Sequence, residues 1–379
     1  MLIGVPCEIK NHEYRVGLTP SSVRELTGHG HQVLVERNAG KGIGAADSEY
    51  VNAGATMAAT AAEVFARAEM IVKVKEPQAA ERAMLRADQV LFTYLHLAPD
   101  PTQCKELMKS NAICIAYETV TQAGGGLPLL APMSEVAGRM AIQAGAHCLE
   151  KAHGGSGILL GGVAGVPPGK IVILGAGVVG TNAAQMAVGT GATVVVMDRN
   201  IEALRRIDRM FNGRVMTVYS TSDAVERHVV SADLVIGGVL IPGAAAPKLI
   251  TRAMVALMKP GSVIVDVAID QGGCAETARA TTHAEPTYLV DGVVHYCVAN
   301  MPGGVPRTST QALNHATLPF VVQLANLGWR KALQADPHLR RGLNVSRGQV
   351  TCREVAEALH HPYQPAEDAI GGSTWVQAE

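Results

Sequence analysis

The stretch KIVILGAGVVGTNAAQMAVGTGATVVVMDRN, residues 170–200, decides the fold of this chain. It opens with an apolar run typical of a buried strand, continues into Gly175, Gly177 and Gly180, and then shows a helical pattern. A second apolar strand ends in Asp198. In such a unit the first glycine permits a tight turn, the second lets the backbone approach a pyrophosphate, and the third allows close helix–strand packing. The stretch therefore predicts a dinucleotide-binding unit.

The residue at the end of the second strand bears on which dinucleotide is bound. Asp198 lies 18 residues beyond Gly180, where a carboxylate can bond a ribose 2′-hydroxyl and would repel a 2′-phosphate. This favours NAD over NADP. Arg199 leaves the alternative open, because an arginine there can neutralise a 2′-phosphate or stack on adenine. The pyrophosphate is expected at the N-terminus of the helix, among backbone N–H groups.

Short apolar runs alternate with helical patterns on both sides of this stretch. Runs that predict strands lie at 1–6, 32–37, 70–75, 89–95 and 112–117 before it, and at 214–220, 233–239, 262–270 and 292–298 after it. Strand–helix alternation is typical of parallel sheets with helices on their faces. The sequence thus predicts an α/β protein with two Rossmann-like, doubly wound domains.

The predicted domains are not both continuous in sequence. A chain of 379 residues suits two domains of roughly 100–200 residues each. The first series of strands ends near residue 130, and a helix with Ser134 as its expected N-cap leads into the second. A long apolar helical pattern near the end is expected to return to the first unit. We therefore expect a central domain at 131–305 and an outer domain made of 1–130 and 306–379, with a loop-like or disordered tail from residue 360.

Composition excludes several classes of protein. With 48% hydrophobic and 17% charged residues and a net charge of -1, the chain can build a large core and has no overall attraction to nucleic acid or anionic membranes. Seven scattered cysteines without a CxxC pair argue against a disulfide framework and a structural zinc site. No metal site is expected, since His29, His31 and the His360–His361 pair lack partners at ligand spacing. The absence of a signal-peptide pattern favours a cytoplasmic location.

Three chargeable residues follow strands of the first unit. Arg15 lies in the loop after the first strand, Lys75 closes the run at 70–75, and His96 follows the strand at 89–95. Ligands of open α/β sheets bind outside the carboxyl ends of the strands, so these side chains are expected at one edge. Lys73 is the alternative to Lys75, which lies nearer the end of its strand. An arginine can hold a carboxylate, a lysine can polarise a carbonyl and a histidine can move a proton, so the set suits a small anionic substrate.

The central domain offers a carboxylate in the equivalent place. Asp270 ends the apolar run at 262–270, where a nicotinamide is expected to project, and Asp266 is the structural alternative within that run. Asp270 is therefore the candidate for a role in proton movement.

The chain resembles bacterial alanine dehydrogenases, in the family that also contains nicotinamide nucleotide transhydrogenase alpha subunits. The resemblance spans nearly the whole chain and rests on IGVPCEIKNHEYRVGLTP, IVKVKEP, LFTYLHLA, APMSEVAGRMA, ILGAGVVG, LIPGAAAPKLIT and GSVIVDVAIDQGG. It implies NAD-dependent interconversion of L-alanine with pyruvate and ammonia. It also implies a substrate domain built from both chain ends around a central NAD domain, and a homo-oligomer, typically a hexamer.

The resemblance also assigns roles to residues. It implies that Arg15 and Lys75 bind the keto acid and that His96 and Asp270 act in proton transfer. The implied cofactor contacts, beyond the three fingerprint glycines, are Ser134, Val178, Val179, Asp198, Ser220, Val239, Leu240, Asn300 and Met301.

Two other functions are kept as alternatives. A transhydrogenase-like protein transfers hydride between nicotinamide cofactors, but that branch of the family lacks a histidine at the position of His96 and an aspartate at that of Asp270. A non-catalytic NAD sensor would keep the glycine fingerprint and would not need Arg15, Lys75 and His96 together. The hypothesis that the chain is an alanine dehydrogenase is preferred, because that activity requires Arg15, Lys75, His96 and Asp270 together.

Overall fold

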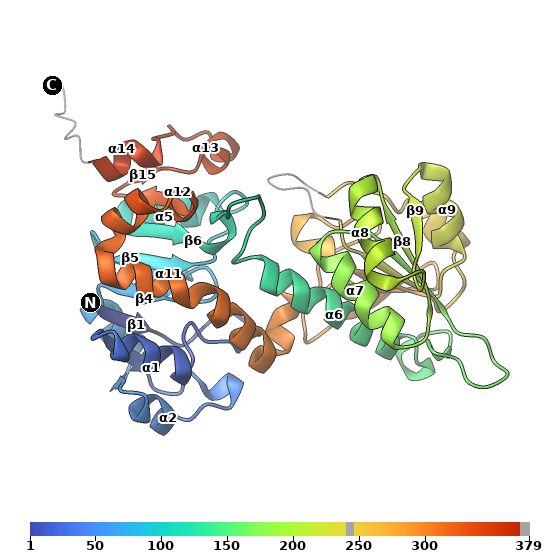
Figure 1. The fold of residues 1–379 in the computed structure, drawn as a ribbon, viewed down its shortest axis with the longest axis horizontal. Coiled ribbons are helices and arrows are strands. Elements are labelled where there is room, and N and C mark those ends of the chain that lie inside the picture. The colour runs from blue at the N-terminus through green and yellow to red at the C-terminus, as the bar shows by residue number, and fades with distance from the viewer. Residues whose placement is uncertain (240–245, 372–379) are drawn as a thin grey trace. The chain divides into compact units, whose positions relative to one another are not determined.

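The computed structural model describes residues 1–239 and 246–371. The chain divides into a first unit, Met1–Met133 with Val305–Glu379, and a second unit, Ser134–Gly304. Each unit has its own parallel-rich sheet, which confirms the predicted α/β class with two Rossmann-like domains (Figure 1). Within the described ranges, no helix combines the length and apolar character needed to cross a membrane.

The sheet of the first unit has the strand order β15-β14-β6-β5-β4-β1-β2-β3. Its strands are β1 (Leu2–Val5), β2 (Gln32–Glu36), β3 (Thr56–Ala58), β4 (Met70–Val72), β5 (Val90–Thr93), β6 (Ile113–Ala116), β14 (Leu343–Ser346) and β15 (Gln349–Val350). All neighbours from β6 to β3 are parallel, and β14 joins β6 in antiparallel orientation. The carboxyl ends of β1, β4, β5 and β6 therefore lie side by side on one edge.

Helices pack on both faces of this sheet. They are α1 (Pro20–Gly28), α2 (Asp47–Asn52), α3 (Ala61–Arg67), α4 (Ala79–Arg82), α5 (Pro101–Ser110), α11 (Pro306–Ala335), α12 (Pro337–Arg340), α13 (Arg353–Leu359) and α14 (Ala366–Gly371). One face packs against α1 and α11, and the other against α3, α5 and α13. Thr19 and Asp100 cap α1 and α5, and each is followed by a proline, which is well tolerated in the first turn of a helix.

The long helix α11 belongs to the first unit although it follows the second in sequence (Figure 1). Its Leu313 and Val321 are buried in the same core as the strand residues on that face. Its Asn314 side chain accepts hydrogen bonds from the Thr19 backbone N–H, at 2.8 Å, and from the Ser22 hydroxyl, at 2.9 Å. Polar bonds and apolar burial together fix α11 against α1.

The second unit has the strand order β12-β13-β11-β10-β7-β8-β9. Its strands are β7 (Lys170–Leu174), β8 (Thr193–Asp198), β9 (Met216–Tyr219), β10 (Leu234–Gly237), β11 (Val263–Asp266), β12 (Thr287–Val290) and β13 (Val293–Tyr296). Its helices are α6 (Ala131–Cys148, which starts in the first unit), α7 (Val178–Gly189), α8 (Ile201–Phe211), α9 (Ser222–Val230) and α10 (Arg252–Leu257). From β9 to β13 the strands are parallel, in the order of a dinucleotide-binding sheet.

Short 3₁₀ helices complete both units. They are η1 (Lys41–Ile43), η2 (Tyr117–Thr119), η3 (Lys151–His153), η4 (Val267–Gln271) and η5 (Met301–Gly304). Of these, η2 and η4 directly follow β6 and β11, so they lie at the carboxyl edges of the two sheets.

Two local predictions are wrong. Ser134 does not cap a helix, because α6 already begins at Ala131 and Pro132, which lacks an N–H, occupies its first turn. The tail is not entirely loop-like, since α14 is helical and its Ala366 and Ile370 are buried in the core of the first unit.

Candidate active site

Arg15 lies in the loop after β1 and is almost fully buried. Its Nε donates to Glu13 Oε1 at 2.7 Å and its Nη2 to Glu13 Oε2 at 2.5 Å, a two-pronged ion pair. Its Nη1 also contacts the Met133 sulfur at 3.0 Å. Burial alone lowers the pKa of the guanidinium, but the hydrogen bonds and negative charge of Glu13 outweigh it and the pKa is raised. Arg15 is therefore a fixed cation whose plane is set by Glu13.

The two candidate lysines after β4 have different environments in the structure. Lys73 is fully buried, and its Nζ pairs with Glu8 at 3.1 Å and with Glu81 at 2.6 Å. Lys75 is half-buried, and its backbone oxygen accepts a hydrogen bond from the Thr93 hydroxyl at 2.9 Å. Lys73 is thus committed to an internal ion cluster, whereas Lys75 lies at the rim of the sheet edge.

His96 lies just beyond β5 in a left-handed backbone conformation, with φ 50°. Its ring is stacked on Tyr94 at 5.8 Å between centroids. Glu118, from η2, accepts the His96 backbone N–H at 2.6 Å, and its carboxylate lies 3.9 Å from the His96 Nδ1. The His96 side chain remains 44% exposed. A stacked, exposed imidazole beside a carboxylate can exchange protons with a bound molecule.

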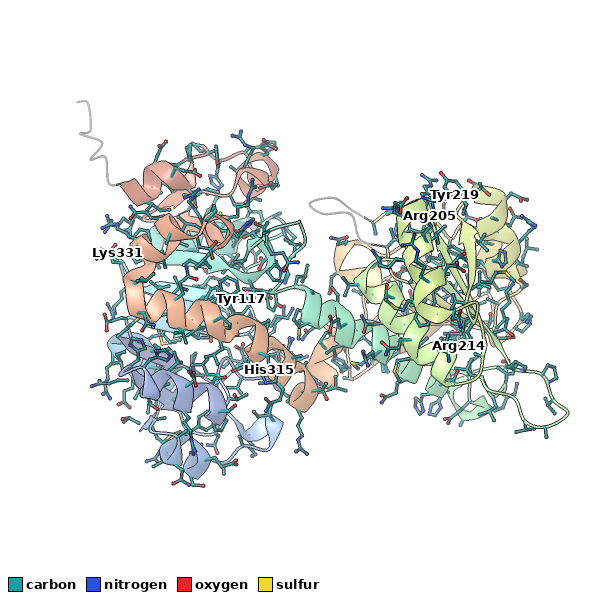
Figure 2. All side chains as sticks on the ribbon, in the orientation of Figure 1. Tyr117, Arg205, Arg214, Tyr219, His315 and Lys331 are labelled. Carbon is teal, nitrogen blue, oxygen red and sulfur yellow. The ribbon has the colours of Figure 1, made fainter. Side chains whose placement is uncertain are left out.

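Three aromatic side chains pack against one another near the carboxyl ends of β5 and β6. Tyr117, labelled in Figure 2, is fully buried. Its ring centroid lies 4.4 Å from that of Phe92 and 5.1 Å from that of Tyr94, and both pairs are edge to face. The Tyr94 hydroxyl donates to the backbone oxygen of Leu129 at 2.5 Å. Because such rings have few rotamers and pack tightly, they hold the segments that carry His96 and Glu118 in place.

Arg15, Lys75 and His96 follow β1, β4 and β5, which are consecutive in the sheet. The sheet topology therefore places all three sequence-predicted residues on the same edge of the first unit. Glu13 and Glu118 join them there. Neither glutamate was predicted from the sequence, although Glu118 also follows a strand and the same edge rule would have placed it here.

The glycine fingerprint has the geometry that its spacing predicts. Gly175 has φ 102°, and a Cβ there would lie 2.8 Å from the Gly238 backbone oxygen. A Cβ at Gly180 would lie 1.8 Å from the Gly175 oxygen, so α7 can approach β7 only with glycine there. Gly177 precedes the first residue of α7, and no atom lies within 4 Å of the position of its absent Cβ. The arrangement leaves space for a phosphate at the helix N-terminus.

Asp198 ends β8 next to this glycine turn. Its Oδ2 accepts the Ala176 backbone N–H at 2.6 Å, and its Oδ1 accepts that of Asn200 at 2.8 Å. The Arg199 Nε donates to the Ser220 backbone oxygen at 3.4 Å. The carboxylate thus holds the glycine turn while remaining half-buried at the edge of the sheet.

The structure also separates Asp266 from Asp270. Asp266 is fully buried, caps η4 by accepting the Ala268 N–H at 3.1 Å, and accepts the Cys274 N–H at 2.8 Å. Burial raises the pKa of Asp266, although these backbone hydrogen bonds oppose the rise. Asp270 lies in η4 and is exposed. Asp266 therefore has a structural role, and Asp270 is the carboxylate accessible to a ligand.

The other expected cofactor contacts are spread over the second unit. Val178 and Val179 open α7, and Val239 follows β10. Ser220 is buried after β9, Met301 is buried in η5, and Asn300 is half-buried with φ 61°. Ser134 lies half-buried in the first turns of α6. Leu240 falls outside the described residues.

Comparison with known proteins places this chain. Residues 4–137 match the family model "Alanine dehydrogenase/PNT, N-terminal domain", and residues 141–353 match "Alanine dehydrogenase/PNT, C-terminal domain". The chain belongs to the alanine dehydrogenase/PNT family. An alanine dehydrogenase of Halomonas elongata is 62% identical over 371 residues, which are 98% of this chain and 100% of the relative.

Solved structures of the family agree with this placement. An L-alanine dehydrogenase superposes with a TM-score of 0.92 at 54% identity, covering 95% of this chain and 99% of that one. A transhydrogenase from Sinorhizobium meliloti superposes with a TM-score of 0.79 at 26% identity, covering 93% of this chain and 99% of that one. Membership of the alanine dehydrogenase/PNT family, together with the Rossmann-type second unit, establishes a nicotinamide cofactor and small-molecule substrates.

Proposed function

We propose that this protein is an NAD-dependent L-alanine dehydrogenase that interconverts L-alanine with pyruvate and ammonia. The observation that carries the proposal is the grouping of Arg15, Lys75 and His96 at one sheet edge, in a chain 62% identical to a curated alanine dehydrogenase. A cation for a carboxylate, a cation for a carbonyl and an acid–base group are what amination of a 2-oxo acid requires.

Substrate binding is assigned to Arg15 and Lys75. The Arg15 guanidinium would hold the carboxylate of pyruvate, and Glu13 fixes the plane in which it does so. The Lys75 ammonium would bind the carbonyl oxygen and stabilise the negative charge that develops there when ammonia attacks. Lys73 is excluded from this role by its internal pairing with Glu8 and Glu81.

Proton movement is assigned to His96 and Asp270. His96 would supply and remove protons as the carbinolamine loses water and becomes the imine, and its position is set by stacking on Tyr94 and by the bond to Glu118. Asp270 would assist these transfers and orient the water that leaves or attacks. NADH, when bound, supplies the hydride that reduces the imine carbon. In the reverse direction the same groups act on the imine formed from L-alanine.

Cofactor binding is assigned to the fingerprint glycines and to Asp198. The backbone N–H groups at the start of α7 would hold the pyrophosphate, and Asp198 would bond the adenosine ribose hydroxyls. The remaining contacts are proposed for Ser134, Val178, Val179, Ser220, Val239, Leu240, Asn300 and Met301. The preference for NAD follows from the negative charge of Asp198.

The setting of the enzyme is also a proposal. Family resemblance supports a homo-oligomer, a hexamer, which the mass in solution would test. All seven cysteines are free thiols, as expected in a reducing compartment such as the cytoplasm.

The test is an assay of NADH oxidation with pyruvate and ammonium, each omitted in turn. We expect turnover with the complete mixture and none when either is left out. Hydride transfer to a second nicotinamide cofactor without pyruvate would instead indicate transhydrogenase-like chemistry. Binding of NADH without turnover in any mixture would indicate a sensor.

A further inference from the structure

We propose that His147, Glu150 and His153 form a binding site for a divalent transition-metal ion. Each residue offers one ligand atom, and the three atoms lie within 4.8 Å of one another. The Nδ1 of His147 lies 3.6 Å from Glu150 Oε1, and the Nδ1 of His153 lies 3.5 Å from Glu150 Oε2. The two imidazole rings are 3.8 Å apart between centroids. The two rings thus lie next to each other, and each presents its Nδ1 to a different oxygen of the same carboxylate.

The backbone beneath the three side chains is held in place. His147 is in the last turn of α6, and the chain then turns through η3 (Lys151–His153). The Glu150 N–H donates to the His147 oxygen at 3.2 Å, and the His153 N–H donates to the Glu150 oxygen at 3.0 Å. Cys148 and Leu149, between the first two ligands, are buried in the core of the second unit. A metal would therefore meet ligands whose main chain is already ordered, which lowers the entropy cost of binding.

A close packing contact fixes the exit from this turn. A Cβ at Gly155 would lie 2.2 Å from the Leu149 backbone carbon, so the chain can pass there only as glycine. The Gly155 N–H also donates to the Glu150 oxygen at 3.1 Å. The turn that carries the three ligands is thus closed by backbone contacts and does not depend on the ligand side chains themselves.

The chemistry of the ligands selects the ion. Two imidazoles and one carboxylate suit Zn²⁺, Ni²⁺ and Cu²⁺, whereas Mg²⁺ and Ca²⁺ prefer oxygen ligands throughout. All three side chains are exposed, so water can complete the coordination shell. The carbonyl end of α6 adds a favourable field for a cation next to His147.

The site lies away from the cofactor-binding edge of its own unit. Ser156, which follows the turn, donates its backbone N–H at 2.8 Å to Gly261, just before β11 begins. The fingerprint glycines follow the carboxyl end of β7, and β7, β10 and β11 are parallel. The metal site is therefore near the amino ends of the strands, at the opposite edge. Its occupancy is expected to stabilise the second unit and to leave the reacting groups untouched.

The test uses the full-length protein, freed of metal by a chelator, with Ni²⁺ and Zn²⁺ as probes in calorimetric titrations. We expect saturable binding that weakens at least about tenfold in the His147→Ala/His153→Ala variant and in Glu150→Gln, because even indirect partners of metal ligands are worth roughly 10–100-fold in affinity. The matched control is His360→Ala/His361→Ala, which removes two consecutive histidines of the first unit. It should bind Ni²⁺ and Zn²⁺ as tightly as the unaltered protein does.

A second readout distinguishes a site from loose association. Binding to the folded state alone raises the thermal midpoint with metal concentration. We expect this rise in the unaltered protein and in the control, and its loss in the His147→Ala/His153→Ala variant. The proposal is overturned if millimolar Ni²⁺ and Zn²⁺ show no saturable binding, or if the cluster variants bind as tightly as the control.

Discussion

Replacement of Arg15 by methionine should separate substrate binding from cofactor binding. Loss of the guanidinium removes a hydrogen-bonded contact to the substrate carboxylate, and bonds to charged groups contribute about 1.5–3 kcal/mol. At 1.4 kcal/mol for each factor of ten, the dissociation constant for pyruvate should rise roughly 10–150-fold. NADH binding, assigned to the other unit, should stay close to that of the unaltered protein.

The same substitution also has a structural cost that must be controlled. Arg15 and Glu13 form a buried pair whose side chains are 1% and 0% exposed. Removing one member of a buried ion pair typically costs about 3–5 kcal/mol of stability, whereas replacing both with neutral residues is often without cost. Arg15→Met should therefore unfold at lower denaturant concentration, and Arg15→Met/Glu13→Gln should recover much of that loss.

The double variant makes the assay decisive. Pyruvate affinity is measured from the dependence of NADH oxidation on pyruvate, NADH affinity from fluorescence titration, and stability from urea unfolding. We expect the double variant to be nearly as stable as the unaltered protein and still unable to bind pyruvate well. If restored stability came with restored pyruvate affinity, Arg15 would be a structural residue and the substrate assignment would be wrong.

Three further predictions concern the proton-transfer groups, the coenzyme and the glycine turn. His96→Ala and Asp270→Asn should each lower the amination turnover by about 10²–10⁴-fold, the usual worth of general acid–base catalysis, with NADH titration unchanged; near-normal turnover in either variant would remove that residue from the mechanism. Asp198 should give NADH a higher specificity constant than NADPH, and equal values would contradict its role. Gly180→Ala places a Cβ 1.8 Å from a backbone oxygen and should abolish NADH binding or folding, whereas Gly189→Ala, with no atom within 4 Å of its Cβ, should leave the NADH dissociation constant unchanged.

The sequence predicted the central elements of each sheet because their pattern is strong. Strands such as β7 and β5 are continuous apolar runs buried on both faces, and that pattern has few other interpretations. The glycine spacing likewise predicted a turn whose contacts the structure shows in detail.

Four strands at or next to the sheet edges were missed, because they are short, have a weak pattern or pair with a distant part of the chain. The strand β3 has three residues and β15 has two, while β12 is half-exposed and β14 pairs with β6, which lies more than two hundred positions earlier in the chain. Such strands are defined by the neighbour they pair with, and that neighbour cannot be read from local sequence.

Contacts between side chains on different elements could likewise not be predicted from the sequence. No spacing rule links Glu118 to His96, since their contact depends on β5 and β6 being neighbours. The trio of His147, Glu150 and His153 was passed over for a related reason, because the turn from α6 into η3, and not a helical face, brings its ligand atoms together.

The return of α11, β14 and β15 to the first unit has a consequence for synthesis on the ribosome. The second unit is continuous in sequence, so it can fold as soon as it emerges. The first unit cannot, because α11, which covers one face of its sheet, and β14, which pairs with β6, are synthesised only after the second unit. During that interval an apolar face and an open strand edge are exposed to the cell, and such surfaces are where nascent chains aggregate. We expect chains released early, before α11 has been made, to be retained by chaperones or degraded, even though their second unit is already folded.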